Sequence, residues 1–398
     1  MYKIVIIKHE DGERLPCLVD DLGMPLVLPN EYIMKKRGLG WGTLKAYLKT
    51  LMYVCQWEYN NINIFQRISE GKFLTEAELS GSLLPYLRKD FSKTKVVKNM
   101  VVSADTYNDR LWLLNLYINN LFKKKLFSTN IGSSEFLVVD SLSKHAFNAI
   151  KQAKLSTPGE DKKNKGISTP QLNFLMEIIE PSSPKNPFSV KSVQIRNYII
   201  IMVEILCGVR PSELLGVKLD DIEFGAMNAI HIRRRPHDPD DPRTGNPEVK
   251  RLGRTFIISD VEFMMKIQNY IENERDALID KYPEKETDFI LHSQHGSPIS
   301  NRTVSNIYVT IRNKFPDIFD LNFTAKSLRH VFSSSLETKM RRAGVPKEER
   351  QKILQYVRGD ESEDSQDVYL GQATMEEVHK YSKQHQKEIF SYAELICF

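Results

Sequence analysis

Two arginines and a late tyrosine stand out in this chain because their types and order suit chemistry on a phosphodiester. Arg210 lies in CGVRPSELL, Arg329 lies in TAKSLRHVF, and Tyr369 lies in SQDVYLGQ. Guanidinium groups bind phosphoryl oxygens bidentately and keep their charge near neutral pH. A tyrosine hydroxyl can attack phosphorus and form a covalent ester that a second hydroxyl later resolves. Such a set could exchange one phosphodiester for another without ATP or a metal ion.

The elements around the two arginines should place both side chains where a ligand can reach them. The stretch SVQIRNYIIIMVEILC is apolar almost all round and predicts a buried helix that stops at Gly208. A second short helix follows at once, so Arg210 lies at a helix junction. Further on, Thr324 is a plausible N-cap. Lys326 and Arg329 then share one helix face near the positive end of the helix dipole.

Between the two arginines the sequence predicts a β-hairpin with the strands NAIHIRRR and RTFIIS. Lys250 lies in the long polar connection, close to the second strand. Histidines and aspartates in the same region suggest a metal site at first sight: His231, His237, Asp238, Asp240 and Asp241. No H-E-x-x-H spacing and no cysteine partner accompany them. We therefore expect a solvated acidic loop and no metal.

This ordered set of motifs resembles the tyrosine recombinase (phage integrase) family, whose members break and rejoin DNA through a phosphotyrosine bond. The resemblance extends from about Gly38 to the C-terminus and is strongest from Thr169 to Gly371. The residues that carry it are Gly208, Arg210, Glu213, Leu214, Arg329, His330, Gly359 and Tyr369. Any one motif alone would be weak, but the order of the whole set is fairly specific.

The resemblance implies a role for the residues that match. Arg210 and Arg329 would bind the scissile phosphate, and Tyr369 would be the nucleophile that forms a 3′-phosphotyrosine. Lys250 would be the general acid that protonates the leaving 5′ oxygen. The competing residues are Arg243 and Arg251 for the lysine's place, and Tyr356 and Tyr381 for the nucleophile.

Three positions near the expected site depart from the family or support it only indirectly. Lys326 stands where family members usually carry a histidine, and would act as a supporting cation. Asp360 occupies the position where histidine or tryptophan normally supports the phosphate. A carboxylate there would repel phosphate unless it were protonated or paired with Arg358, which could also do that work itself. His330 is expected to pack or to support the site rather than to catalyse.

Breaks in composition divide the chain into five expected parts: a small N-terminal β-element at 1–36, a helical core-binding domain at 37–141, a linker at 142–166, a catalytic domain at 167–371 and a tail helix at 372–398. The expected fold is mainly α with a small antiparallel β-sheet in the catalytic domain. The resemblance implies a multi-domain DNA clamp. Basic residues near the helical domain should contact phosphates: Arg88, Lys89, Lys93, Lys95, Lys98, Lys123, Lys124 and Lys125.

The tail carries apolar residues at roughly helical spacing: Val378, Tyr381, Ile389, Phe390 and Leu395. The pattern alone fits a helix packed on its own domain as well as one that docks on a neighbouring subunit. Relatives pass a terminal helix between protomers, so the resemblance favours a homo-oligomer held through this tail. That assembly would be a dimer on one DNA site and a tetramer on paired sites, with accessory recombinases as further possible partners.

Composition agrees with this interpretation without deciding it. The chain of 398 residues has a net charge of +5, a mild excess that suits DNA but is common elsewhere. Four cysteines without a C-x-x-C pair, and no signal peptide or long apolar run, favour a cytoplasmic protein without membrane contact. It would be nucleoid-associated when bound to DNA. No cofactor is expected.

We therefore expect site-specific cleavage and rejoining of double-stranded DNA, for integration, excision or transposition of a mobile element. Two alternatives stay open. One is a type IB topoisomerase-like enzyme, which shares the chemistry. The other is a catalytically silent relative that binds DNA and assists an active partner, and Asp360 keeps it open. The choice of target sequence would depend on base contacts and on DNA deformability.

Overall fold

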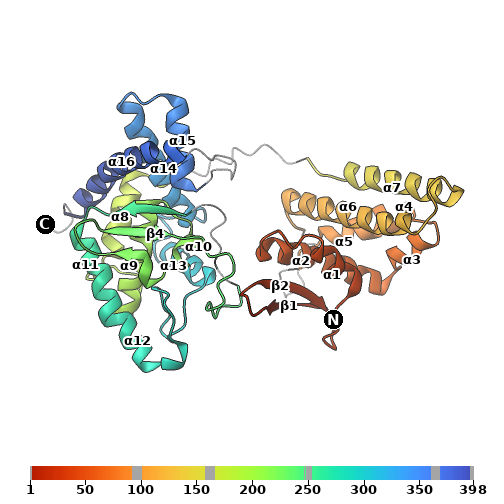
Figure 1. Cartoon of the computed structure of the whole chain (residues 1–398), viewed down its shortest axis with the longest axis horizontal. Helices are drawn as coiled ribbons and strands as arrows, with labels where there is room; N and C mark the ends of the chain where they lie inside the picture. The colour runs from red at the N-terminus through yellow and green to blue at the C-terminus, as the bar shows by residue number, and fades with distance from the viewer. Residues whose placement is uncertain are drawn as a thin grey trace. The chain divides into compact units, whose positions relative to one another are not determined.

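The computed structural model describes residues 2–91, 101–156, 166–245, 247, 253–359 and 368–394. The chain divides into two compact units, Met1–Lys162 and Lys163–Phe398, here called the N-terminal and the C-terminal unit. Helices dominate both units, and each contains a small antiparallel sheet (Figure 1). The expected fold class is confirmed.

The N-terminal unit packs helices against a β-hairpin. Its elements are β1 (Lys3–Lys8), β2 (Arg14–Val19), α1 (Val27–Met34), α2 (Trp41–Asn60), α3 (Ile64–Ser69), α4 (Glu76–Glu78), η1 (Leu79–Leu83), α5 (Leu84–Arg88), α6 (Ala104–Phe127) and α7 (Ser134–Gln152). Leu18 on β2 is fully buried, in the same core as Leu48 of α2 and Leu114 of α6. The N-terminal β-element therefore shares the core of the helices that follow it.

Two helices of this unit show what local sequence signals determine. Ser103 caps α6 as expected, since its side chain accepts a hydrogen bond from a backbone N–H of the first turn. Helix α7 lies beside α6 (Figure 1) and continues to Gln152, well into the stretch 142–166 that was predicted as a linker. Its buried positions explain the difference, because they recur at helical spacing and face the core: Val139, Ala146 and Ile150.

The C-terminal unit surrounds one buried helix. Its elements are α8 (Thr169–Ile179), α9 (Lys191–Cys207), α10 (Pro211–Leu214), η2 (Leu219–Asp221), β3 (Ile222–Glu223), β4 (Ala229–Ile232), β5 (Arg254–Ile257), α11 (Val261–Asn269), η3 (Tyr270–Arg275), α12 (Asp276–Lys281), η4 (Pro283–Lys285), α13 (Asn301–Lys314), α14 (Ala325–Arg342), α15 (Lys347–Arg358) and α16 (Val368–Glu394). Every residue of α9 from Arg196 to Cys207 is buried, and α14 packs along it. The strands pair in the order β3-β4-β5, with Ile232 opposite Arg254.

Helix α16 packs against the core of its own unit. Val378, Tyr381 and Ile389 are each at most 2% exposed and belong to the same hydrophobic core as α9 and α14. The apolar face that was predicted to meet a neighbouring subunit is therefore covered within the same chain. Packing on its own domain is one of the two arrangements that the apolar pattern fitted equally well. Leu395, the last apolar position of that prediction, lies outside the described residues.

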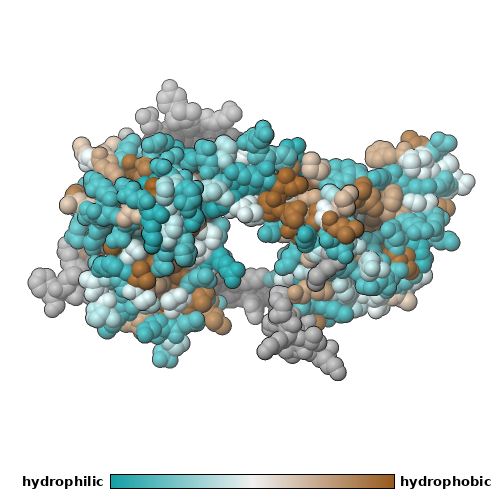
Figure 2. Space-filling view, turned by 90° about the horizontal axis from the view of Figure 1, so that it is seen from below, coloured by the Kyte–Doolittle hydropathy of each residue, from teal (hydrophilic) through white to brown (hydrophobic). Residues whose placement is uncertain are grey.

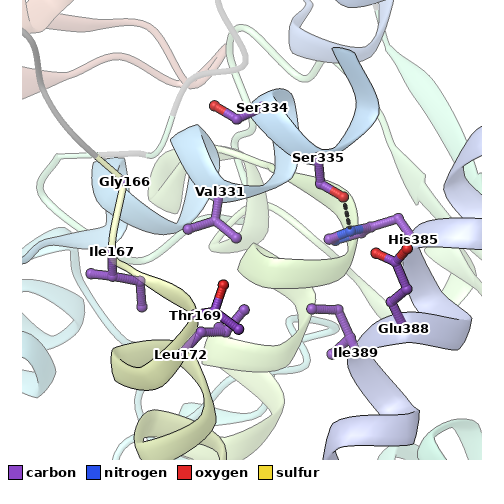
Figure 3. A pocket seen from close by; sticks show the side chains of 10 residues that line it. All are labelled: Gly166, Ile167, Thr169, Leu172, Val331, Ser334, Ser335, His385, Glu388 and Ile389. Carbon is purple, nitrogen blue, oxygen red and sulfur yellow. Dashed lines mark hydrogen bonds between the residues drawn. The ribbon is translucent and has the colours of Figure 1, made fainter. Parts of the chain in front are cut away.

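Two polar side chains anchor α16. The imidazole of His385 donates from Nε2 to the Ile205 carbonyl on α9 at 3.0 Å and accepts at Nδ1 from the Ser335 hydroxyl on α14 at 2.9 Å (Figure 3). Burial lowers the pKa of His385 to about 4, so the ring is neutral. Gln386 accepts from the backbone N–H of Ser259 at 2.9 Å, just after β5. A cavity of about 310 Å³ lies between α8, α14 and α16 beside His385.

The exposed surface is uneven. On the face shown in Figure 2, the larger hydrophobic patches lie on the N-terminal unit. The most exposed apolar residues of that unit lie at helix ends and in turns: Leu22, Phe127 and Ile131. None of the helices in the described ranges combines the length and apolar composition that crossing a bilayer requires.

Candidate active site

Arg210 leaves the core at the helix junction predicted for it. Helix α9 ends at Gly208, whose φ of 60° lies in the left-handed region. A Cβ at this position would lie 2.2 Å from the ring of Phe332, so the junction requires glycine. Arg210 is the N-cap of α10, and its side chain is 31% exposed. The buried helix thus brings one guanidinium to the surface at a fixed point.

The buried carboxylate of Glu213 fixes the position of the Arg210 guanidinium. Its carboxylate accepts hydrogen bonds from the backbone N–H and from Nη1 of Arg210, at 2.8 and 2.9 Å. It also accepts from Nη2 of Arg254 at 2.6 Å, and both of these side chains are almost fully buried. Burial alone would raise the pKa of the Glu213 carboxyl, but the two guanidinium groups hold it below its usual value. Glu213 therefore stays charged and fixes the direction of Arg210.

Arg329 meets Arg210 at a single backbone oxygen. Nη1 of Arg329 donates to the Gly208 carbonyl at 2.7 Å, and Nη2 donates to the Arg358 carbonyl at 2.6 Å. Nη1 of Arg210 donates to the same Arg358 carbonyl at 2.9 Å. Two guanidinium groups from distant parts of the sequence thus converge on one oxygen atom. Such an arrangement can hold an oxygen between two positive charges.

The chain passes close to these arginines where α15 ends. Gly359 caps α15 in the left-handed region, at a φ of 60°, and a Cβ there would lie 2.7 Å from Nη1 of Arg254. Glycine therefore lets the backbone run close against the arginines. Arg358 contributes its carbonyl to this cluster. Asp360, the residue that departs from the family pattern, lies outside the described residues.

Lys326 and His330 lie in the first two turns of α14, which Thr324 caps as predicted. Lys326 is exposed and precedes Arg329 by one turn. Burial, together with the positive charges of Lys326 and two neighbouring arginines, lowers the pKa of the His330 imidazole. The ring is therefore neutral near pH 7, which suits a packing role or a supporting role rather than a charged one.

The tyrosines considered as the nucleophile differ in how accessible their side chains are to a substrate. Tyr369 lies in the first turn of α16, and its side chain is outside what the structure describes. Tyr381 is 2% exposed and lies within the hydrophobic core. Tyr356 is partly buried against that core. Tyr381 could reach a substrate only if the core opened, so Tyr369 stays the predicted nucleophile.

Lys250 and Arg251 both lie outside the described residues, so the place of the expected general acid stays a prediction. Arg243, the other residue considered for it, has a side chain that is 8% exposed. Its guanidinium donates to the backbone carbonyls of Leu215 and Ile299, both at 3.0 Å. A buried and fully engaged arginine is not available to a leaving group, so Arg243 is excluded, and Lys250, with Arg251 as its competitor, stays the predicted general acid.

The acidic connection between β4 and β5 is not solvated as expected. Asp238 pairs with Lys218 at 2.8 Å, and Asp241 pairs with Arg243 at 2.8 Å. Asp241 is 1% exposed. The prediction of a solvated loop was wrong for these two aspartates, which ion pairs with Lys218 and Arg243 hold buried, whereas His237 and Asp240 are exposed as expected. Among the described residues no group of histidine, cysteine or carboxylate side chains is arranged to hold a metal ion.

The basic residues expected to bind DNA fall into three groups. Arg88, Lys89 and Lys123 are exposed on the N-terminal unit. Lys124 pairs with Glu31 at 2.5 Å and Lys125 with Glu135 at 2.7 Å, so part of their charge is already balanced. The remaining three lie outside the described residues: Lys93, Lys95 and Lys98. Of the five described residues, two are therefore already paired with carboxylates.

Arg254 is the site residue that sequence reasoning missed. In the sequence it was only the first residue of the predicted strand RTFIIS, yet it lies on β5 and binds the carboxylate that orients Arg210. A signal was present, because Arg254 alternates with Phe256 on one face of a strand that is otherwise apolar on that face. An arginine at a core-facing position of a strand needs a buried partner.

Comparisons with known proteins identify a matching family model and similar folds. The sequence model of the Phage integrase family matches residues 167–361. A search of curated proteins found no match. Among solved structures, a XerH site-specific recombinase bound to difH substrate in a pre-cleavage complex has 16% identity and a TM-score of 0.50. That match covers 83% of this chain and 78% of the other.

Two further solved structures are similar at lower TM-scores. A Tn1549 transposon integrase in complex with transposon right end DNA has 14% identity and a TM-score of 0.45, over 88% of this chain and 97% of that one. A lambda integrase bound to DNA has 13% identity and a TM-score of 0.45, over 86% of this chain and 94% of that one. The family match spans every arginine of the cluster described above, and residues 167–361 therefore form a domain of the phage integrase family, the tyrosine recombinases.

Proposed function

We propose that this protein cleaves and rejoins double-stranded DNA at specific sites through a 3′-phosphotyrosine intermediate. The observation that carries the proposal is the convergence of Arg210 and Arg329 on one carbonyl oxygen, at 2.9 and 2.6 Å. An oxygen of a phosphodiester would meet the same donors if it took that place. Integration, excision or transposition of a mobile element is the setting that fits this chemistry.

The reaction assigns each residue a step. Arg210 and Arg329 bind the oxygens on which charge develops, a contribution of the kind that is worth roughly 10³–10⁵ in rate for an arginine at a phosphoryl group. The oxygen of Tyr369 bonds to phosphorus and loses its proton to water. The bond to the 5′ oxygen breaks, and that oxygen keeps the electron pair and takes a proton from Lys250. A second 5′ hydroxyl later displaces the tyrosine. Lys326 supports the anionic site as an exposed cation.

The N-terminal unit would hold the DNA. Arg88, Lys89 and Lys123 are exposed there, and phosphate contacts from such residues fix a protein on a duplex without reading its sequence. The XerH and lambda integrase structures contain DNA, and one lambda integrase structure is a dimer. We propose a dimer on one site and a tetramer on paired sites for this chain. Exchange of α16 between protomers would first require the hydrogen bonds of His385 and Gln386 to break.

A nicked suicide substrate tests the proposal. The wild-type protein should form a protein–DNA adduct that resists denaturant, and it should do so in excess EDTA because all the required cations belong to side chains. Tyr369→Phe should abolish the adduct while leaving DNA binding nearly intact, since the change removes one hydroxyl and no charge.

Tyr381→Phe is the matched control, because it makes the same change at a buried core tyrosine. An adduct that survives in Tyr369→Phe and disappears in Tyr381→Phe would overturn the assignment of the nucleophile. Tight DNA binding by the wild-type protein without any adduct would instead favour the silent relative, which Asp360 keeps open. Relaxation of supercoils without exchange between paired sites would favour the topoisomerase-like alternative.

A further inference from the structure

The carbonyl oxygen of Arg358 uses hydrogens that a bound phosphate would need. A terminal guanidinium nitrogen carries two hydrogens. Nη1 of Arg210 makes two hydrogen bonds, one to the Glu213 carboxylate and one to the Arg358 carbonyl, both at 2.9 Å. Nη2 of Arg329 donates to the same carbonyl at 2.6 Å. While these bonds persist, Nη1 of Arg210 has no hydrogen to offer to a substrate.

The other acceptors of these two arginines are fixed in the core. Glu213 is 2% exposed and is also bound to Arg254 at 2.6 Å. The Gly208 carbonyl, which accepts from Nη1 of Arg329 at 2.7 Å, lies at the end of the buried helix α9. A Cβ on Gly208 would overlap the ring of Phe332, so this backbone is tightly enclosed. Neither acceptor can move aside without opening the core.

Helix α15, which supplies the third acceptor, is held less firmly than α9. Two of its twelve residues are buried, Ile353 and Val357, and the others are at least partly exposed. The last carbonyls of a helix lack partners within it, and the Arg358 carbonyl finds its partners in Arg210 and Arg329. Cations also suit the negative end of the helix dipole. The residues expected to bind DNA therefore cap the last turn of α15.

A phosphodiester is a stronger partner for this pair of cations than a peptide carbonyl. It carries a full negative charge on its non-bridging oxygens, whereas the carbonyl is one end of a dipole. Guanidinium groups can also bind a phosphate bidentately. A phosphate that reaches Arg210 and Arg329 should therefore displace the Arg358 carbonyl.

We propose that the Arg358 carbonyl is a built-in competitor of the scissile phosphate: it occupies the place of a phosphate oxygen in the DNA-free protein, and the last turn of α15 withdraws when the substrate binds. This inference rests on the proposed function. The contact keeps Arg210 and Arg329 aligned before DNA arrives. It also weakens the binding of any phosphate, because two hydrogen bonds must break first.

Hydrogen–deuterium exchange of the full-length chain tests the withdrawal. The protein is Tyr369→Phe, which keeps the DNA intact, and the duplex is one that the wild type cleaves in the adduct assay. With an ordinary scissile phosphate, the backbone N–H groups of residues 353–359 should exchange about tenfold faster than in the free protein, the factor that one hydrogen bond to a charged group contributes. A methylphosphonate at the scissile position removes that charge and keeps the other phosphates. Bound to this control duplex, residues 353–359 should exchange as in the free protein.

A substitution in the last turn of α15 tests the competition without changing an arginine. Gln355 is exposed there, and glycine has a lower helix propensity. At subsaturating DNA, Gln355→Gly should therefore form the adduct up to about fivefold faster than the wild type. Gln355→Ala is the matched control, because it also removes the side chain but favours the helix, and it should not speed the reaction. If α15 only supported the fold, Gln355→Gly would be the slower of the two variants.

Exchange at residues 353–359 that is unchanged or slower on the ordinary duplex overturns the inference while the proposed function stands. Equal acceleration by the methylphosphonate duplex overturns it as well, and so does a folded Gln355→Gly variant that is no faster than Gln355→Ala. If Gln355→Gly does not fold, the exchange measurement decides. Failure of the wild-type protein to form any adduct overturns the proposed function instead.

Discussion

Two buried glutamates on consecutive helices of the C-terminal unit behave in opposite ways. Glu204 on α9 is fully buried, and its only hydrogen-bonding side chain among the described contacts is the hydroxyl of Tyr308. Burial raises its pKa to about 8. Glu213 on α10 is 2% exposed, yet its pKa is lowered, because two arginines outweigh its burial. Burial by itself does not decide the charge of a carboxyl group; its partners do.

This difference in charge distinguishes the hydrophobic core, where Glu204 lies, from the candidate active site, where Glu213 lies. A neutral Glu204 can lie inside the core with a tyrosine hydroxyl as its partner, since an uncharged acid loses little on leaving water. A charged Glu213 is needed where it lies, because it turns Arg210 outward and holds Arg254 inside. The site thus keeps a net positive charge at the surface over a buried ion pair that fixes its geometry.

Of the changes considered for these buried groups, removal of Arg254 should have the largest effect on stability and on adduct formation. Arg254→Ala leaves the Glu213 charge buried with one cation fewer, and breaking such a pair costs about 3–5 kcal/mol of unfolding free energy. Chemical denaturation measures the loss. Adduct formation should also fall, because Glu213 no longer orients Arg210 firmly.

A second buried arginine provides the control for this prediction. Arg275 donates to the backbone carbonyls of Phe289 and Thr287 and has no contact with Glu213 among the described residues. Arg275→Ala should destabilise the unit while the rate of adduct formation, measured well below the melting temperature, stays near that of the wild type. Equal losses of activity in both variants would show that Arg254 supports only the fold.

The pH dependence of stability should show the raised pKa of the Glu204 carboxyl. Its pKa in the folded protein, about 8, lies above that of an exposed glutamate. Below about pH 4.5 both states are protonated and the contribution to stability is fully present. As pH rises toward 8 only the unfolded state ionises, so stability is lost progressively through this window and fully above it. The melting temperature should therefore fall between pH 5 and about 9.

Glu204→Gln keeps the shape and removes the ionisation. Its melting temperature should change less over the same pH range, and the variant should be more stable than the wild type near pH 9. Glu213→Gln, the matched change on α10, should not flatten this alkaline limb, because the pKa of Glu213 is shifted downward. A wild-type profile that stays flat from pH 5 to about 9 would contradict the assigned charge state of Glu204.

Exposed cations should give the smallest effects and leave the chemical step alone. Replacing Arg88, Lys89 or Lys123 by alanine should each reduce the slope of log K against log salt for duplex binding by about 0.9. Lys125→Ala should change the slope less, because Lys125 already pairs with Glu135. Binding titrations at several salt concentrations measure this. Unchanged slopes for all three exposed residues would remove the N-terminal unit from the proposed DNA interface.

Local chemistry made part of the site predictable. Gly208 ends α9, Thr324 caps α14, and the junction at Arg210 follows from residue types that act within a few positions. Strand pairing of β4 with β5 was likewise visible as alternation in the sequence. Each of these features depends on neighbours along the chain, which a sequence displays directly.

The remaining features depend on contacts that no local pattern encodes. The carbonyl that accepts from Arg210 lies 148 positions away in Arg358, and the carboxylate that holds Arg254 lies 41 positions away. The acidic connection appeared solvated because its partner Lys218 belongs to another element. Helix α16 was predicted to dock on a neighbouring subunit because the apolar pattern of a helix does not indicate which surface it packs against.

The length of helix α16 fixes the position of Tyr369 relative to the rest of the C-terminal unit. Tyr369 lies at one end of a continuous helix whose other half is fastened by His385 and Gln386. Each residue of an α-helix adds about 1.5 Å of length and about 100° of rotation. The number of residues between the fastened half and Tyr369 therefore sets the distance of the proposed nucleophile from the two anchors and its angular position around the helix axis. A gain or loss of one residue between the anchors and Tyr369 would therefore rotate Tyr369 by about 100° around the helix axis.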